Sequence, residues 1–234
     1  MLVIAHRGAN REATENTRKA FELAIEGGCG RIEVDLQITK DEYIVIYHDG
    51  EIDHQPISGM SFDATKKLMA DKKVELLTID ELLNEFGHKV ELNLEIKPEF
   101  SKIPALLVDK LKNEKLKPIV ISSFYPNPLQ ECKNLGVPAE IAFLWDYESE
   151  EKTTKETYIE VMDDLNCKIF HPHCDMVDKN MMQWAQKKSW LVYPWVPMAG
   201  EQNPKELWVK LKELGVDGLC TNIPREMREW LRVT

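Results

Sequence analysis

The chain has 234 residues, 43% of them apolar and 30% charged, values that are ordinary for a globular protein with a buried core. Its 30 Lys and Arg against 40 Asp and Glu give a net charge of −10, which disfavours non-specific binding to nucleic acid or to an anionic membrane. No run approaches the roughly 18 apolar residues of a membrane span, and the few residues before His6 are too short for a signal peptide. We therefore expect a cytoplasmic protein without a stable membrane anchor.

Short apolar runs rich in β-branched residues alternate with helical patterns along the whole chain, which is typical of successive strand-helix units and a parallel sheet. Eight runs are predicted to be strands: 2–5, 31–36, 92–96, 119–122, 140–144, 168–171, 191–195 and 218–221.

The segments between these strands carry helix signals. Asn16 is expected to cap a helix that ends at Gly27 and Gly28. Thr78 and Glu81 fit the capping box of a helix over 79–86. Three helices are expected to have a proline in or just before their first turn: 104–111, 207–214 and 227–231. Three further helices are expected from weaker patterns: 129–134, 155–165 and 181–187.

Eight strands that are each followed by a helix predict a (β/α)₈ TIM barrel, with 1–234 forming one α/β domain. An open doubly wound sheet shows the same alternation, but no G-x-G-x-x-G cofactor loop follows the first strand. The run 43–47 is interpreted as a hairpin at the barrel rim. Residues 49–75 then form a small insertion between the second strand and its helix.

In such a barrel the active site lies at the carboxyl ends of the strands. Glu33 and Asp35 are two residues apart on the second strand, so their side chains share one face. The pattern places seven reactive side chains at this end of the barrel: His6, Arg7, Glu33, Asp35, His48, Glu95 and Lys97.

Three neighbouring carboxylates repel one another, by roughly 4 kcal/mol for a pair about 4 Å apart at an effective dielectric constant near 20. A divalent cation removes that cost. Because Glu33, Asp35 and Glu95 offer only oxygen ligands, they indicate Mg²⁺ or Ca²⁺ rather than zinc. Arg7 and Lys97 would then hold a phosphoryl group.

Histidines beside a metal bound by carboxylates alone are free to transfer protons, and an unperturbed pKa of about 6.5 suits an acid and base pair. His6 and His48 are the candidates, which leaves open which is the acid and which is the base. Trp195 is interpreted as a pocket wall, and the run 171–174 as structural or substrate-lining. Together these features indicate phosphoester cleavage.

The motifs that carry this chemistry also form a family pattern. They are His6-Arg7-Gly8, Glu15-Asn16-Thr17, Glu33-Val34-Asp35, His48-Asp49, Thr78-Ile79-Asp80-Glu81-Leu82, Leu94-Glu95-Ile96-Lys97, Ser122-Ser123-Phe124 and Val216-Asp217-Gly218 with Thr221. In this order the chain resembles the glycerophosphodiester phosphodiesterases.

The resemblance implies a TIM barrel that uses a divalent cation to hydrolyse glycerophosphodiesters to sn-glycerol 3-phosphate and an alcohol. By matching positions it implies the following roles: metal ligands Glu33, Asp35 and Glu95, proton carriers His6 and His48, and phosphate contacts Arg7 and Lys97. The chain departs from the family pattern at Thr14, at 54–56, after Trp195 and at Asn222, all outside the metal and proton-transfer set.

Two other functions remain open on the sequence. A phospholipase D-type activity on lysophospholipids fits the same residues, but the acidic chain shows no obvious amphipathic anchor. A noncatalytic phosphate-binding barrel would be expected to lack a histidine or a ligand. The sequence does not decide the preferred alcohol, Mg²⁺ against Ca²⁺, water against the glycerol hydroxyl as nucleophile, or the oligomeric state.

Overall fold

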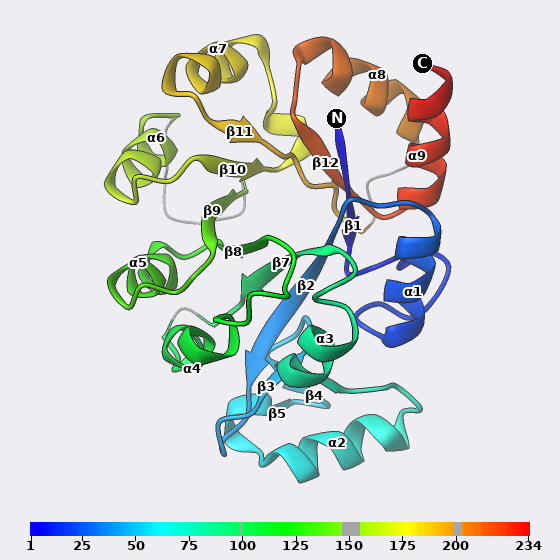
Figure 1. Ribbon diagram of the computed structural model, residues 1–234, viewed down its shortest axis with the longest axis vertical. Helices are drawn as coiled ribbons and strands as arrows, with labels where there is room; N and C mark the ends of the chain where they lie inside the picture. The colour runs from blue at the N-terminus through cyan, green and yellow to red at the C-terminus, as the bar shows by residue number, and fades with distance from the viewer. Residues whose placement is uncertain (99, 147–154, 199–202) are drawn as a thin grey trace.

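The computed structural model describes residues 1–98, 100–146, 155–198 and 203–234, and Figure 1 shows helices arranged around a central set of strands. The parallel strands follow one another around the ring in the order β11-β10-β9-β8-β7-β2-β1-β12. Their bounds are β1 (Leu2–His6), β2 (Arg31–Ile38), β7 (Glu91–Ile96), β8 (Ile119–Ser123), β9 (Glu140–Trp145), β10 (Ile169–Pro172), β11 (Leu191–Val192) and β12 (Gly218–Thr221).

The two ends of this strand order meet beyond β11. An isolated parallel bridge pairs Trp195 with Cys220, and the Cys220 N–H donates to the Pro194 carbonyl at 2.8 Å. The predicted seventh strand over 191–195 was therefore too long, because regular pairing stops after Val192 and resumes only at Trp195. Pro194 lacks an N–H and interrupts a strand at this place. The predicted α/β barrel architecture is otherwise the one observed.

Helices lie outside the ring: α1 (Arg18–Glu26), α3 (Ile79–Glu85), α4 (Ile103–Lys110), α5 (Pro126–Asn134), α6 (Lys155–Asp164), α7 (Lys179–Lys188), α8 (Pro204–Leu214) and α9 (Pro224–Val233). The predicted capping box of α3 is formed in both directions by Thr78 and Glu81. The predicted cap of α1 was wrong. Thr17 caps that helix, while Asn16 has a φ of 57° and turns its side chain elsewhere. None of the described helices is long and apolar enough to cross a bilayer.

The insertion after the second strand has a structure of its own. The predicted hairpin is β3 (Ile44–Ile46), which pairs antiparallel with β2 and with β6 (Leu77–Thr78). Between them lie β4 (Glu51–Ile52), β5 (Gln55–Pro56), a short 3₁₀ turn (Ile57–Gly59) and α2 (Phe62–Asp71), whose helix was not expected. A separate small apolar cluster supports this unit: Val45, Ile52, Ile57, Met69 and Leu76.

The barrel interior is apolar only in the part away from the carboxyl ends of the strands. An inner cluster of small and medium side chains fills it: Ile4, Val120, Ala142, Ile169, Tyr193 and Cys220. A much larger cluster lies between the strands and the surrounding helices. Towards the carboxyl ends of the strands the interior becomes polar, because Glu33, Asp35 and Glu95 all point inward and are buried. The core therefore supports a polar site at the mouth of the barrel.

Candidate active site

A cavity of about 220 Å³ opens at the carboxyl ends of the strands. Seven of the eight predicted site residues line it, and Asp35 lies beneath, fully buried. The lining is His6, Arg7, Glu33, His48, Asn93, Glu95, Lys97, Phe124, Leu144, Asp146, His171, Trp195 and Cys220. Strand ends that are distant in sequence thus bring the predicted residues into one space.

The three acidic side chains come from two neighbouring strands. In the parallel pairing of β2 with β7, Asp35 lies opposite Glu95, and Glu33 lies two residues before Asp35 on the same face. One carboxylate oxygen from each residue lies within 4.8 Å of the others. All three residues are buried, with exposed fractions of 4% for Glu33, 0% for Asp35 and 7% for Glu95.

Two cationic side chains compensate part of this charge, and they do so unevenly. Arg7 Nε lies 3.2 Å from Asp35 Oδ2, and Lys97 Nζ lies 3.6 Å from Asp35 Oδ1 and 2.9 Å from Glu95 Oε1. Burial acts to raise the pKa of Asp35, but Lys97 and Arg7 hold that pKa below its usual value. Burial and the charges of Asp35 and Glu95 raise the pKa of Glu33 well above its usual value. Glu33 therefore carries the least compensated charge of the three.

The donor set fits a hard divalent cation. Glu33 Oε1 and Asp35 Oδ1 are buried and accept no hydrogen bond from any residue in the described part of the chain. Unpaired buried carboxylate oxygens are costly, and a cation that prefers oxygen ligands would remove that cost. Glu33, Asp35 and Glu95 are thus suited to Mg²⁺ or Ca²⁺ in both chemistry and spacing.

The two histidines have different surroundings. His6 Nδ1 lies 2.9 Å from Asn222 Oδ1, an oxygen that also accepts from Asn10 Nδ2 at 2.8 Å. An acceptor at that position assigns the proton to Nδ1 and leaves Nε2 as the basic nitrogen. Burial, and then Arg7, lower the pKa of His6 to about 4, so its ring is neutral at pH 7.

His48 lies at the open side of the cavity, after β3. Its Nδ1 is 2.7 Å from Asp49 Oδ1, and Gln37 Nε2 donates to the His48 carbonyl at 3.0 Å. About a third of its side chain is exposed. In both imidazoles Nε2 is thus the nitrogen that no oxygen of the described residues engages.

The sequence analysis did not predict that two asparagines, Asn16 and Asn222, contact residues of the site. Asn16, expected to be a helix cap, donates from Nδ2 to Asp35 Oδ2 at 2.8 Å. Its φ of 57° is a conformation that Asn adopts more readily than most residues, but the sequence alone does not reveal it. Asn222, noted only as a departure from the family pattern, contacts His6.

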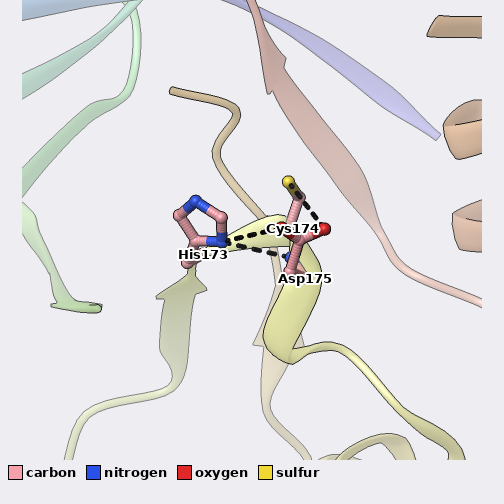
Figure 2. A group of neighbouring side chains, drawn as sticks. All are labelled: His173, Cys174 and Asp175. Carbon is pink, nitrogen blue, oxygen red and sulfur yellow. Dashed lines mark hydrogen bonds and ion pairs between the residues drawn. The ribbon is translucent and has the colours of Figure 1, made fainter. Parts of the chain in front are cut away.

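The histidine and cysteine run after β10 is a structural turn in its own right (Figure 2). His173 Nδ1 accepts a hydrogen bond from the Asp175 N–H at 3.2 Å and caps a short 3₁₀ turn (Cys174–Met176). Burial raises the pKa of the Cys174 thiol to about 12, so it is not a thiolate at neutral pH. His173, Cys174 and Asp175 are near neighbours, but His173 Nδ1 is already engaged by the backbone of the turn. His171 lies apart from them and lines the cavity.

Comparison with known proteins gives a consistent result. The model of the glycerophosphoryl diester phosphodiesterase family matches residues 6–226. A glycerophosphodiester phosphodiesterase from Caldanaerobacter subterraneus subsp. tengcongensis is 27% identical over 99% of this chain and 98% of its own.

Solved structures show the same fold. The glycerophosphodiester phosphodiesterase of Thermotoga maritima superposes with a TM-score of 0.78 at 20% identity, over 100% of this chain and 99% of that one. An Oleispira antarctica phosphodiesterase was solved in complex with the product sn-glycerol-3-phosphate. It superposes with a TM-score of 0.81 at 23% identity, over 99% of this chain and 97% of that one.

Proposed function

Because the chain belongs to the glycerophosphoryl diester phosphodiesterase family, we propose that its barrel-mouth cavity hydrolyses glycerophosphodiesters to sn-glycerol 3-phosphate and an alcohol. The observation that carries the proposal is the convergence of a carboxylate trio, two cationic side chains and two imidazoles around one cavity. A phosphodiester needs compensation of its negative charge and two proton transfers, and these groups provide both. We expect the enzyme to act on small water-soluble esters in the cytoplasm.

Glu33, Asp35 and Glu95 would hold the divalent cation, Mg²⁺ or Ca²⁺. When bound, such a cation supplies positive charge that polarises a phosphoryl oxygen. The Arg7 guanidinium can hold two phosphoryl oxygens through its planar fork, and Lys97 adds a second positive charge from the neighbouring strand. These two side chains orient the phosphodiester with its ester bond between the histidines.

The environments of the two histidines favour different roles. His6 is buried and neutral, with Nδ1–H held by Asn222, so its Nε2 accepts a proton from the attacking hydroxyl. His48 lies at the open side of the cavity and protonates the departing alcohol, which leaves into solvent. The attacking hydroxyl belongs either to water or to the glycerol itself.

An apolar wall completes the cavity. Phe124 and Trp195 contact edge to face, with ring centroids 5.8 Å apart, and Leu144 lies beside them in the lining. Lys97 Nζ lies 5.9 Å from the centre of the Phe124 ring, which ties this wall to the cationic pair. The wall is suited to the carbon skeleton of the ester.

The test is an assay of glycerophosphocholine and lysophosphatidylcholine, with chelator and then with Mg²⁺ or Ca²⁺ added back singly. We expect turnover of glycerophosphocholine that is lost with chelator and restored by one of the ions. Faster cleavage of lysophosphatidylcholine would favour a phospholipase D-type activity instead. Binding of cation and phosphate without turnover of any ester would identify a noncatalytic barrel.

A further inference from the structure

Besides atoms of the charged side chains described above, two polar atoms in the wall of the active-site cavity are buried without a hydrogen-bond partner among the described residues. They are His171 Nε2, on β10, and Asn93 Oδ1, on β7. Each residue is only 1% exposed, and both line the cavity. An unpaired buried polar atom is costly, so a partner that enters the cavity is expected for each.

His171 is held as a hydrogen-bond acceptor. Its ring packs against the Tyr193 ring, with centroids 5.6 Å apart, and makes a hydrogen bond to the Tyr193 backbone that favours a protonated nitrogen. Because Nε2 is the unpartnered nitrogen, that bond belongs to Nδ1–H. Burial, and then the charge of Arg31, lower the pKa of His171 to about 3, so the ring is neutral and Nε2 offers a lone pair. Asn93 Oδ1 is an acceptor by its chemistry.

The placement of these acceptors relative to the charged groups defines the shape of a ligand. Strands β8 and β9 separate β10 from β7 in the sheet order, so His171 faces the carboxylate trio across the barrel. Asn93 lies two residues before Glu95 on the same strand and directly opposite Glu33 on β2. Phosphate held by Arg7 and Lys97 would therefore leave its carbon chain between the apolar wall and two hydrogen-bond acceptors.

We propose that His171 Nε2 and Asn93 Oδ1 form a hydroxyl-binding subsite that accepts hydrogen bonds from the two free hydroxyl groups of a glycerol phosphate. Two acceptors and two donors match in number, and an ester without hydroxyl groups would leave both acceptors unpaired. Sites that hydrogen-bond a substrate hydroxyl reject analogues that lack it. The subsite rests on the proposed function with water as the attacking group, because both glycerol hydroxyls donate to it, and it assigns the selectivity for glycerol esters to these two residues.

The experiment compares the binding of sn-glycerol 3-phosphate and n-propyl phosphate by calorimetry in the presence of Mg²⁺. We expect the unmodified protein to bind the glycerol compound at least about tenfold more tightly. His171→Phe should reduce this preference to about threefold or less, and His171→Gln, which keeps an acceptor, should recover part of it. Lys188→Gln removes an ion pair with Asp163 on the outer helices and touches no cavity residue, so it should keep the preference.

Equal binding of the two phosphates by the unmodified protein would overturn the proposal and indicate that ordered water fills the subsite. An undiminished preference in His171→Phe would also overturn it. If His171→Phe does not fold, Asn93→Leu is measured in the same way and decides. Selective binding without turnover would reject the hydrolytic function alone, whereas turnover with equal binding would reject the subsite alone.

Discussion

Replacing Glu33 by Gln is predicted to stabilise the cation-free protein while it abolishes activity. Glu33 is buried, its pKa is raised well above the usual value, and no cationic side chain forms an ion pair with it in the described part of the chain. A group with a raised pKa contributes its full stability below the pKa of the unfolded chain and loses it as pH rises. The cost of Glu33 is therefore greatest at alkaline pH.

The size of the effect follows from the spacing of the trio. With oxygens within 4.8 Å, each of the two neighbouring carboxylates repels Glu33 by about 3 kcal/mol at an effective dielectric constant near 20. Arg7 offsets part of this, since its backbone N–H donates to Glu33 Oε2 at 3.0 Å. We expect Glu33→Gln to gain about 2 to 4 kcal/mol at pH 8, a rise in melting temperature of roughly 5 °C or more.

The assay is thermal unfolding at pH 8 with chelator and then with increasing Mg²⁺ or Ca²⁺. The unmodified protein should be stabilised by the cation, whereas Glu33→Gln should start higher and respond little. Glu91→Gln on β7 is the matched control, because its carboxylate pairs with Arg31 and should not affect the response to cation. Near pH 4.5 the advantage of Glu33→Gln should disappear.

A lower melting temperature for chelated Glu33→Gln at pH 8 would refute the reasoning that Glu33 is an uncompensated charge. An undiminished response to cation in that variant would refute its role as a ligand. The two results are independent, so the electrostatic argument and the metal site are tested separately.

Further variants test the proton carriers and their supports. His6→Ala and His48→Ala should each lower kcat by roughly 10² to 10⁴, measured on glycerophosphocholine, and a near-normal rate would exclude that histidine from proton transfer. Asn222→Ala should lower kcat with little change in KM. Nitrogen NMR of the His6 ring should show that its proton is no longer held on Nδ1, and an unchanged tautomer would contradict the role of Asn222 in positioning that proton. Asn16→Leu removes the hydrogen bond to Asp35 and should weaken cation binding by about 10- to 100-fold in calorimetry, whereas unaltered affinity would show that Asp35 needs no such support.

The parts of the site that the sequence predicts lie on regular strands or shortly after their carboxyl ends. A period of two assigns Glu33 and Asp35 to one face, and parallel strands bring His6 and Glu95 to the same end of the sheet. These rules are local, so they need no knowledge of packing. The fold was predictable for the same reason, since each strand and its following helix carry their own pattern.

The sequence did not reveal the roles of Asn16 and Asn222, because these roles depend on contacts between distant segments. Asn16 precedes a helix, where Asn is a common cap, but Thr17 occupies that position and Asn16 instead reaches β2. Asn222 and His6 are 216 residues apart and meet only because β12 pairs with β1. The subsite acceptors His171 and Asn93 could not be identified either, since an unpaired atom is a property of the packed interior.

The charge of the site explains how an acidic protein can bind an anion. Three carboxylates and the cations of Arg7 and Lys97 sum to −1, and the raised pKa of Glu33 shows that even this charge is difficult to maintain without a further cation. In that state Arg7 and Lys97 are occupied by Asp35 and Glu95. A bound divalent cation would change the sum to +1 and would make both side chains available to a phosphodiester. Substrate affinity should therefore depend on the trio as strongly as on the residues that contact phosphate, and binding of cation and substrate should reinforce each other.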